Sequence, residues 1–100
     1  MEPRASQQTA FTSTTGGVMT DEVGAITGDL EVETHIESGS LAVRVRYAGA
    51  GEWYTVTGSP VLPEEPGAEL HERVVEHLTT PGPVVGGNEE AVSLRGMDLS

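Results

Sequence analysis

The hydrophobic and polar positions between residues 30 and 57 alternate with the period of half-buried β-strands. Three such runs follow one another: LEVETHIE (30–37), LAVRVRY (41–47) and EWYTVT (52–57). Within each run apolar side chains occupy alternate positions, which places them on one face of a strand. The turn-forming segments ESGS and AGAG separate the runs and favour an antiparallel meander.

The pattern changes to a helical period in AELHERVVEHL, residues 68–78. At about 100° per residue, one arc of this helix is apolar apart from a histidine. Its members are Leu70, His71, Val74, Val75 and Leu78. Pro81 and Gly82 end the helix. We therefore expect an α+β fold, in which a three-stranded antiparallel β-meander carries one C-terminal α-helix packed on its apolar face.

The ends of the chain lack such periodicity. Residues 1–28 are rich in Ser, Thr, Gln and Gly, and Phe11 is their only aromatic side chain. This composition predicts a disordered N-terminal tail. The ordered α+β domain is expected to span residues 29–80. Residues 81–100 are expected to form a linker or tail, in which EAVSLR (90–95) is either a short added strand or a docking peptide.

The strand register follows from matching apolar positions across the two turns. With a four-residue loop at the first turn, Ile36, Thr34, Val32 and Leu30 lie opposite Leu41, Val43, Val45 and Tyr47, respectively. With a four-residue loop at the second turn, Val45 and Val43 lie opposite Tyr54 and Val56. The same register aligns Glu31 with Arg46 and Trp53, and Glu33 with Arg44 and Thr55. A slip of one residue would turn an arginine toward the core, where an unpaired charge is very costly.

Two interpretations of Arg44, Arg46 and Trp53 follow from this register. In the first, the arginines are structural: cross-strand ion pairs contribute about 0.2–1 kcal/mol each, and an arginine over an exposed indole adds about 0.5–1 kcal/mol. In the second, the three side chains form a contact surface, because a Trp on a solvated sheet face is a natural anchor for a partner. The second interpretation predicts a small, acidic, non-catalytic protein-interaction or regulatory module.

A small-ligand or metal-binding domain is the alternative function, with Glu33, His35 and His71 as its candidate residues. Neighbouring positions on one strand face lie about 7 Å apart, which is too open for a tight ion site without further ligands. HERVVEH differs from HExxH: His71 and His77 point about 120° apart around a helix and cannot hold one ion together. His71 therefore also fits a hydrogen-bonded side chain in the core.

Composition narrows the function further. The chain has no cysteine and no lysine, and its arrangement of serines and carboxylates matches no catalytic motif, so we expect neither an enzyme nor a cofactor. A net charge of −11 disfavours direct binding to nucleic acid or to anionic membranes. It leaves a third candidate function, an acidic nucleic-acid mimic that inhibits a DNA-binding protein. Without a signal or membrane-spanning run, the protein is expected to be cytoplasmic.

The small size of the predicted domain favours association. Below ~70–80 residues a single core seldom supplies more than ~3–5 kcal/mol. The outer strands of the meander also have backbone groups left to pair. We therefore expect a protein partner and a homodimer.

Overall fold

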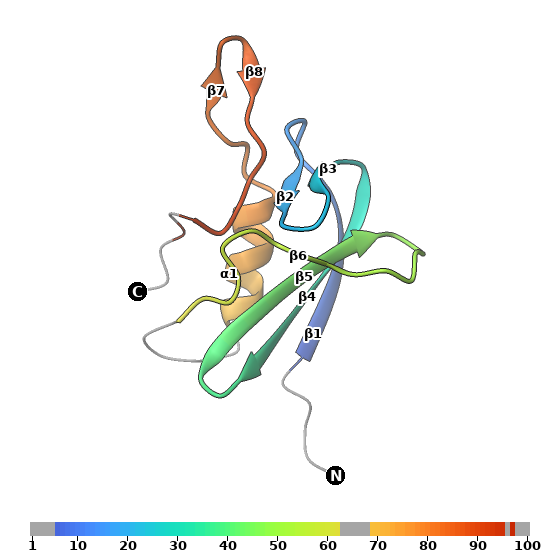
Figure 1. Cartoon of the computed structure of the whole chain (residues 1–100), viewed down its shortest axis with the longest axis vertical. Helices are drawn as coiled ribbons and strands as arrows, with labels where there is room; N and C mark the ends of the chain where they lie inside the picture. The colour runs from blue at the N-terminus through green and yellow to red at the C-terminus, as the bar shows by residue number, and fades with distance from the viewer. Residues whose placement is uncertain (1–5, 63–68, 96, 98–100) are drawn as a thin grey trace.

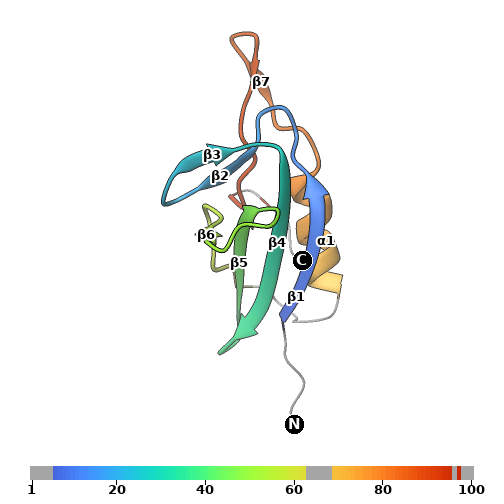
Figure 2. The ribbon, with the colours of Figure 1, turned by 90° about the vertical axis from the view of Figure 1, so that its right-hand side faces the viewer.

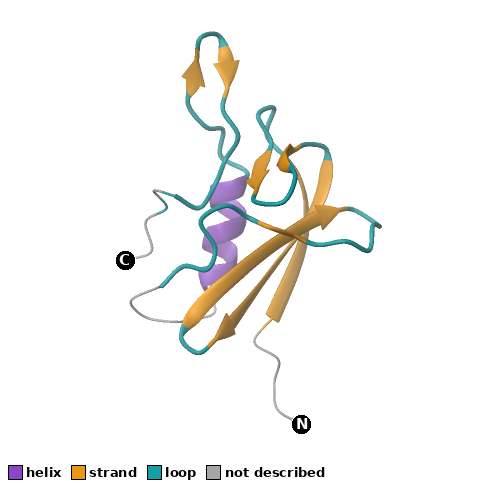
Figure 3. Ribbon diagram, viewed as in Figure 1, coloured by secondary structure: helices purple, strands orange, loops and turns teal. Residues whose placement is uncertain are grey.

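The computed structural model describes residues 6–62, 69–95 and 97. Its elements follow one another along the chain as shown in Figure 1. They are β1 (Ser6–Thr12), β2 (Val18–Thr20), β3 (Gly24–Ile26), β4 (Asp29–Glu37), β5 (Ser40–Tyr47), β6 (Tyr54–Thr55), α1 (Glu69–Leu78), β7 (Val84–Val85) and β8 (Asn88–Glu89). The fold is α+β, as predicted, with α1 on one face of an antiparallel sheet (Figure 3).

The main sheet confirms the predicted register of its central strands. Along β4 and β5, Val32 lies opposite Val45 and Thr34 opposite Val43, while Glu31 lies opposite Arg46. Tyr54 of β6 lies opposite Val45. Burial of the valines and pairing of the charges select the same alignment, because successive side chains on a strand point to opposite faces.

The sheet has four strands in the order β1-β4-β5-β6, and not the three predicted. β1 pairs with β4 in antiparallel fashion, with Thr9 opposite Val32 and Phe11 opposite Leu30. The prediction of a disordered tail at residues 1–28 was therefore wrong for residues 6–26, which contain β1, β2 and β3; residues 1–5 lie outside the described residues. Here β4 provides the pairing partner for a segment that has almost no apolar pattern of its own.

The third predicted strand is shorter than its alternation indicates. β6 contains only Tyr54 and Thr55, and the next residue, Val56, forms an isolated antiparallel bridge with Thr20 of β2. Gly58 has a φ of 101°, a conformation that glycine adopts most readily, and the chain then turns back so that Val61 pairs with Leu41. Within this turn, the Ser59 hydroxyl accepts the hydrogen bond from the Val43 amide at 2.9 Å.

Segments from both ends of the chain complete the core. The buried side chains include Val18 and Ile26 of the β2–β3 hairpin, and Val92 and Leu94 near the C-terminus. Val92 forms a parallel bridge with Val18. The core therefore extends beyond the predicted range of 29–80, and residues 92–94 are part of it rather than of a linker. The β7–β8 hairpin, between α1 and this segment, extends away from the rest of the fold (Figure 1).

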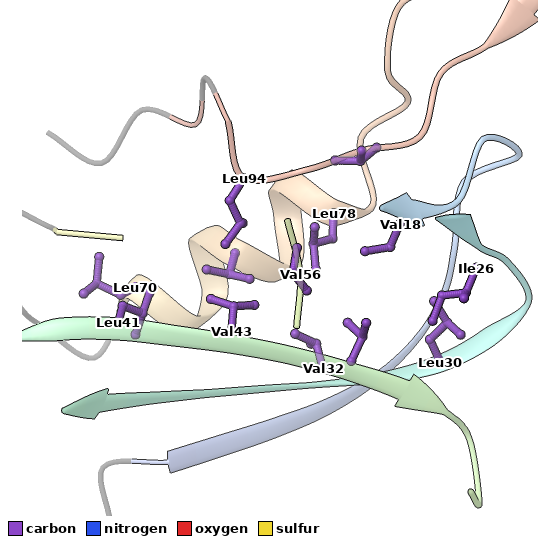
Figure 4. Packing of buried hydrophobic residues seen from close by; sticks show 13 residues of the cluster. Val18, Ile26, Leu30, Val32, Leu41, Val43, Val56, Leu70, Leu78 and Leu94 are labelled. Atoms are coloured by element: carbon purple, nitrogen blue, oxygen red, sulfur yellow. The ribbon is translucent and has the colours of Figure 1, made fainter. Parts of the chain in front are cut away.

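Helix α1 covers the apolar face of the sheet through the predicted arc. Leu70, His71, Val74 and Leu78 are buried, and Val75 packs at the margin. Figure 4 shows the core side chains between the helix and the sheet. They are Val18, Ile26, Leu30, Val32, Leu41, Val43, Val45, Val56, Leu70, Val74, Leu78, Val92 and Leu94. No helix among the described residues is long and apolar enough to cross a membrane.

Candidate functional site

The face of the main sheet turned away from α1, here called the outward face, carries the predicted ion pairs. Arg46 Nε lies 2.6 Å from Glu31 Oε1, and Arg44 Nε lies 3.0 Å from Glu33 Oε1. Arg44 Nη2 also contacts the same Glu33 oxygen. The Glu33 side chain is only 12% exposed, whereas that of Arg44 is 42% exposed. Glu31 and Glu33 of β4 are therefore paired with the two arginines of β5 across the strands, as predicted.

Trp53 precedes β6 and lies beside both arginines. The guanidinium carbon of Arg46 is 4.4 Å from the centre of the Trp53 ring system, and that of Arg44 is 5.3 Å from it. Both distances are within the range of cation–π attraction. Trp53 is half-buried and is not a member of the core, whereas its neighbour Tyr54 packs against the core. The three predicted contact residues thus form one continuous cluster on the outward face.

An acidic turn that the sequence reasoning missed covers the outer edge of β6. The Glu22 carboxylate, between β2 and β3, accepts hydrogen bonds from the Thr55 amide at 2.7 Å and the Thr55 hydroxyl at 2.8 Å. These hydrogen bonds lower the pKa of Glu22. Asp21 accepts a hydrogen bond from the Thr57 hydroxyl at 2.9 Å. No local pattern indicates this contact, because Glu22 and Thr55 are far apart in the sequence.

A pocket of about 490 Å³ adjoins the Arg44 side of the cluster. It lies between the β4–β5 turn and the segment that follows β6. Its lining combines aliphatic atoms with polar groups and consists of Glu37, Ser38, Ser40, Ala42, Arg44, Thr55, Ser59 and Pro60. The pocket exists because the chain turns back after Gly58, a feature that strand periodicity does not predict.

His71 lies on the other side of the sheet from Glu33 and His35. Its Nε2 is 2.7 Å from the Thr9 hydroxyl of β1, and its Nδ1 is 2.7 Å from the Thr34 hydroxyl of β4. A neutral imidazole satisfies both contacts, because one ring nitrogen donates and the other accepts. Burial lowers the pKa of His71, and the nearby Glu72 carboxylate opposes this with a smaller effect.

The structure does not bring the candidate ligand residues together. Glu33 pairs with Arg44, and His35 Nε2 lies 3.4 Å from Glu37 Oε1 on the outward face, while His71 is in the core. Among residues 6–62, 69–95 and 97, no group of three or more His, Cys, Asp or Glu side chains is arranged to hold a metal ion. His71 instead joins α1 to β1 and β4.

A search with the chain finds no matching family model, no matching curated protein and no matching solved structure.

Proposed function

We propose that this protein is a small, acidic, non-catalytic interaction module that binds a protein partner through the cluster of Arg44, Arg46 and Trp53. The supporting observation is the position of Trp53, which is half-buried on the outward face and held against two guanidinium groups. A regulatory role at a cytoplasmic location is part of this proposal.

The cluster has the physical features of a binding anchor. Trp and Arg are enriched among the residues that dominate the energetics of protein interfaces, and a Trp ring buries a large amphipathic area with little loss of conformational freedom. The ion pairs to Glu31 and Glu33 hold both arginines in place before binding. A preorganised surface loses less side-chain entropy when a partner binds.

The test is partner capture by the full chain with a photo-crosslinkable residue at Thr57, which lies beside β6. The wild type is expected to yield a discrete crosslinked species, and Trp53→Ala is expected to abolish it. Tyr47→Ala is the matched control, since Tyr47 is an aromatic residue with 43% exposure that lies outside the cluster. Circular dichroism checks that each variant keeps its fold.

Two results would contradict the proposal. One is capture that survives Trp53→Ala unchanged. The other is equal loss in Tyr47→Ala, which would indicate a contact elsewhere. The contact surface of a captured partner can then be mapped by the amide chemical shifts of this protein. These shifts should change along β5 and β6 and remain constant on α1.

Small-ligand binding is a second candidate function, and the pocket beside Arg44 supports it. Its volume of about 490 Å³ is within the usual range for ligand sites of about 300–1,000 Å³. Trp53 is the only tryptophan and stacks with Arg44, so its fluorescence reports on this pocket. Titration with a panel of small carboxylates should quench or shift the emission in the wild type, and Ala42→Leu, which fills the pocket, should remove that response.

The third candidate, nucleic-acid mimicry, needs free carboxylates arranged like phosphates. The outward face does not favour it, because Glu31 and Glu33 are each paired with an arginine. The exposed side of α1 carries three glutamates, Glu69, Glu72 and Glu76. Nucleic-acid mimicry by this side of the helix stays a prediction.

A further inference from the structure

The two edges of the main sheet differ. At the β6 edge, the Asp21 amide donates to the Thr55 carbonyl at 2.9 Å, the Glu22 carboxylate accepts from the Thr55 amide, and the Thr57 amide donates to the Met19 carbonyl at 3.0 Å. At the β1 edge, no other strand of the described chain pairs with β1 (Figure 2). Within residues 6–62, 69–95 and 97, the fold therefore covers the β6 edge and leaves the β1 edge without a neighbouring strand.

The hydrogen-bond pattern identifies which groups of β1 face the open edge. The Ser13 amide donates to the Gly28 carbonyl at 2.9 Å, which continues the register of β1 on β4. Residues that bond to the neighbouring strand alternate along an antiparallel strand. Thr9 and Phe11 therefore bond to β4, whereas the amides and carbonyls of Gln8, Ala10 and Thr12 point away from it.

The same residues are accessible. Gln8, Ala10 and Thr12 are exposed, whereas Thr9 and Phe11 are half-buried. Helix α1 approaches β1 on the core side, through the contact between His71 and Thr9. The β1 edge thus presents a row of backbone donors and acceptors that no other strand of the described residues pairs with, which is a template for a further strand.

The β1 edge also lacks the features that normally prevent such pairing. Natural proteins protect edges with charged side chains, prolines or bulges. Residues 6–20 contain no Asp, Glu, Lys, Arg or Pro, although the chain carries a net charge of −11. The longest stretch of the chain without an Asp, Glu, Lys or Arg therefore includes its open sheet edge.

We propose that two copies of the chain pair antiparallel through their β1 edges, which joins their four-stranded sheets into one continuous sheet. A two-fold axis perpendicular to the sheet relates the copies, so each β1 meets the same strand in reverse. Two copies of this acidic chain repel each other over most of their surfaces. The uncharged β1 edge is a place where they can meet without that repulsion. The seam consists of Ser, Thr, Gln and Ala side chains; the Ser, Thr and Gln groups each donate and accept hydrogen bonds, and the small Ala10 methyl allows close approach.

The test uses the full chain in sedimentation equilibrium over a wide range of concentrations. The wild type is expected to show a monomer–dimer equilibrium. Ala10→Pro removes an amide that faces the open edge and that the β1–β4 ladder does not use. It should weaken dimerisation about tenfold or more, because the two-fold axis places Ala10 at the seam in both copies and a backbone hydrogen bond is lost at each. Gln8→Glu places like charges at the seam and should act in the same direction, even if Ala10→Pro fails to fold.

Val85→Glu is the matched control for charge. Val85 is 58% exposed in the β7–β8 hairpin, away from β1, so the dimer should persist. Amide hydrogen exchange adds a second measurement: Ala10 should be protected in concentrated and not in dilute solution, and Phe11 in both. A wild type that stays monomeric throughout would overturn the proposal, as would a dimer lost in Val85→Glu and kept in Ala10→Pro. These results are independent of Trp53 and of its partner.

Discussion

The buried contact between His71 and Thr34 allows a quantitative test of how α1 is held on the sheet. Thr34 is 2% exposed and His71 is 5% exposed, so water cannot readily replace a lost partner. Thr34→Val keeps the side-chain volume and removes the hydroxyl that lies 2.7 Å from His71 Nδ1. Leaving a buried polar atom without a partner costs about 1–3 kcal/mol. We expect Thr34→Val to lower the free energy of unfolding by that amount.

Urea denaturation followed by circular dichroism measures this loss. Thr9→Val removes the other partner of His71, but Thr9 is only half-buried and water can take its place, so a loss of about 0.5–1 kcal/mol is expected. The double variant His71→Leu with Thr34→Val removes both polar groups. It should be more stable than Thr34→Val alone, because replacing both partners of a buried hydrogen bond with apolar groups is nearly neutral.

The order of the three variants decides the outcome. If Thr34→Val is as stable as the wild type, His71 is not held against β4 in the core. If Thr9→Val also has no effect, β1 does not lie where the sheet places it. A double variant less stable than either single change would show that unpaired polar atoms do not cause the loss of stability in Thr34→Val.

Two further predictions concern pH and packing. Because burial lowers the pKa of His71, the unfolded chain takes up a proton at a higher pH than the folded chain. The contribution of His71 to the free energy of unfolding should be constant above the ordinary pKa of about 6.5 and should decrease as pH falls from there toward the lowered pKa. His71→Gln should show a shallower decrease, and equal slopes would contradict the assignment. Gly16→Ala should cost about 1–3 kcal/mol, because its Cβ would lie 2.4 Å from the Glu90 carbonyl oxygen, whereas Gly51→Ala has open space and should be neutral or slightly stabilising in the same melts.

The sequence alone determined the β4–β5–β6 register and the helix. Each of these rests on a local pattern with a single low-energy solution. The alternation of valines with glutamates and arginines allows only one alignment that buries the former and pairs the latter, so Glu31, Arg46 and Trp53 could be placed together beforehand. The arc of Leu70, Val74 and Leu78 likewise fixed the buried side of α1.

The roles of the two ends of the chain depend on long-range contacts in the folded protein. β1 has Phe11 as its single large apolar residue, and its order comes from the ladder with β4 and from the contact of Thr9 with His71. Val92 is buried because β2 lies beside it. Such segments gain order from partners distant in the sequence, so their own side-chain pattern carries too little information to predict it. The open edge of β1, and the pocket beside Arg44, follow from those same long-range contacts.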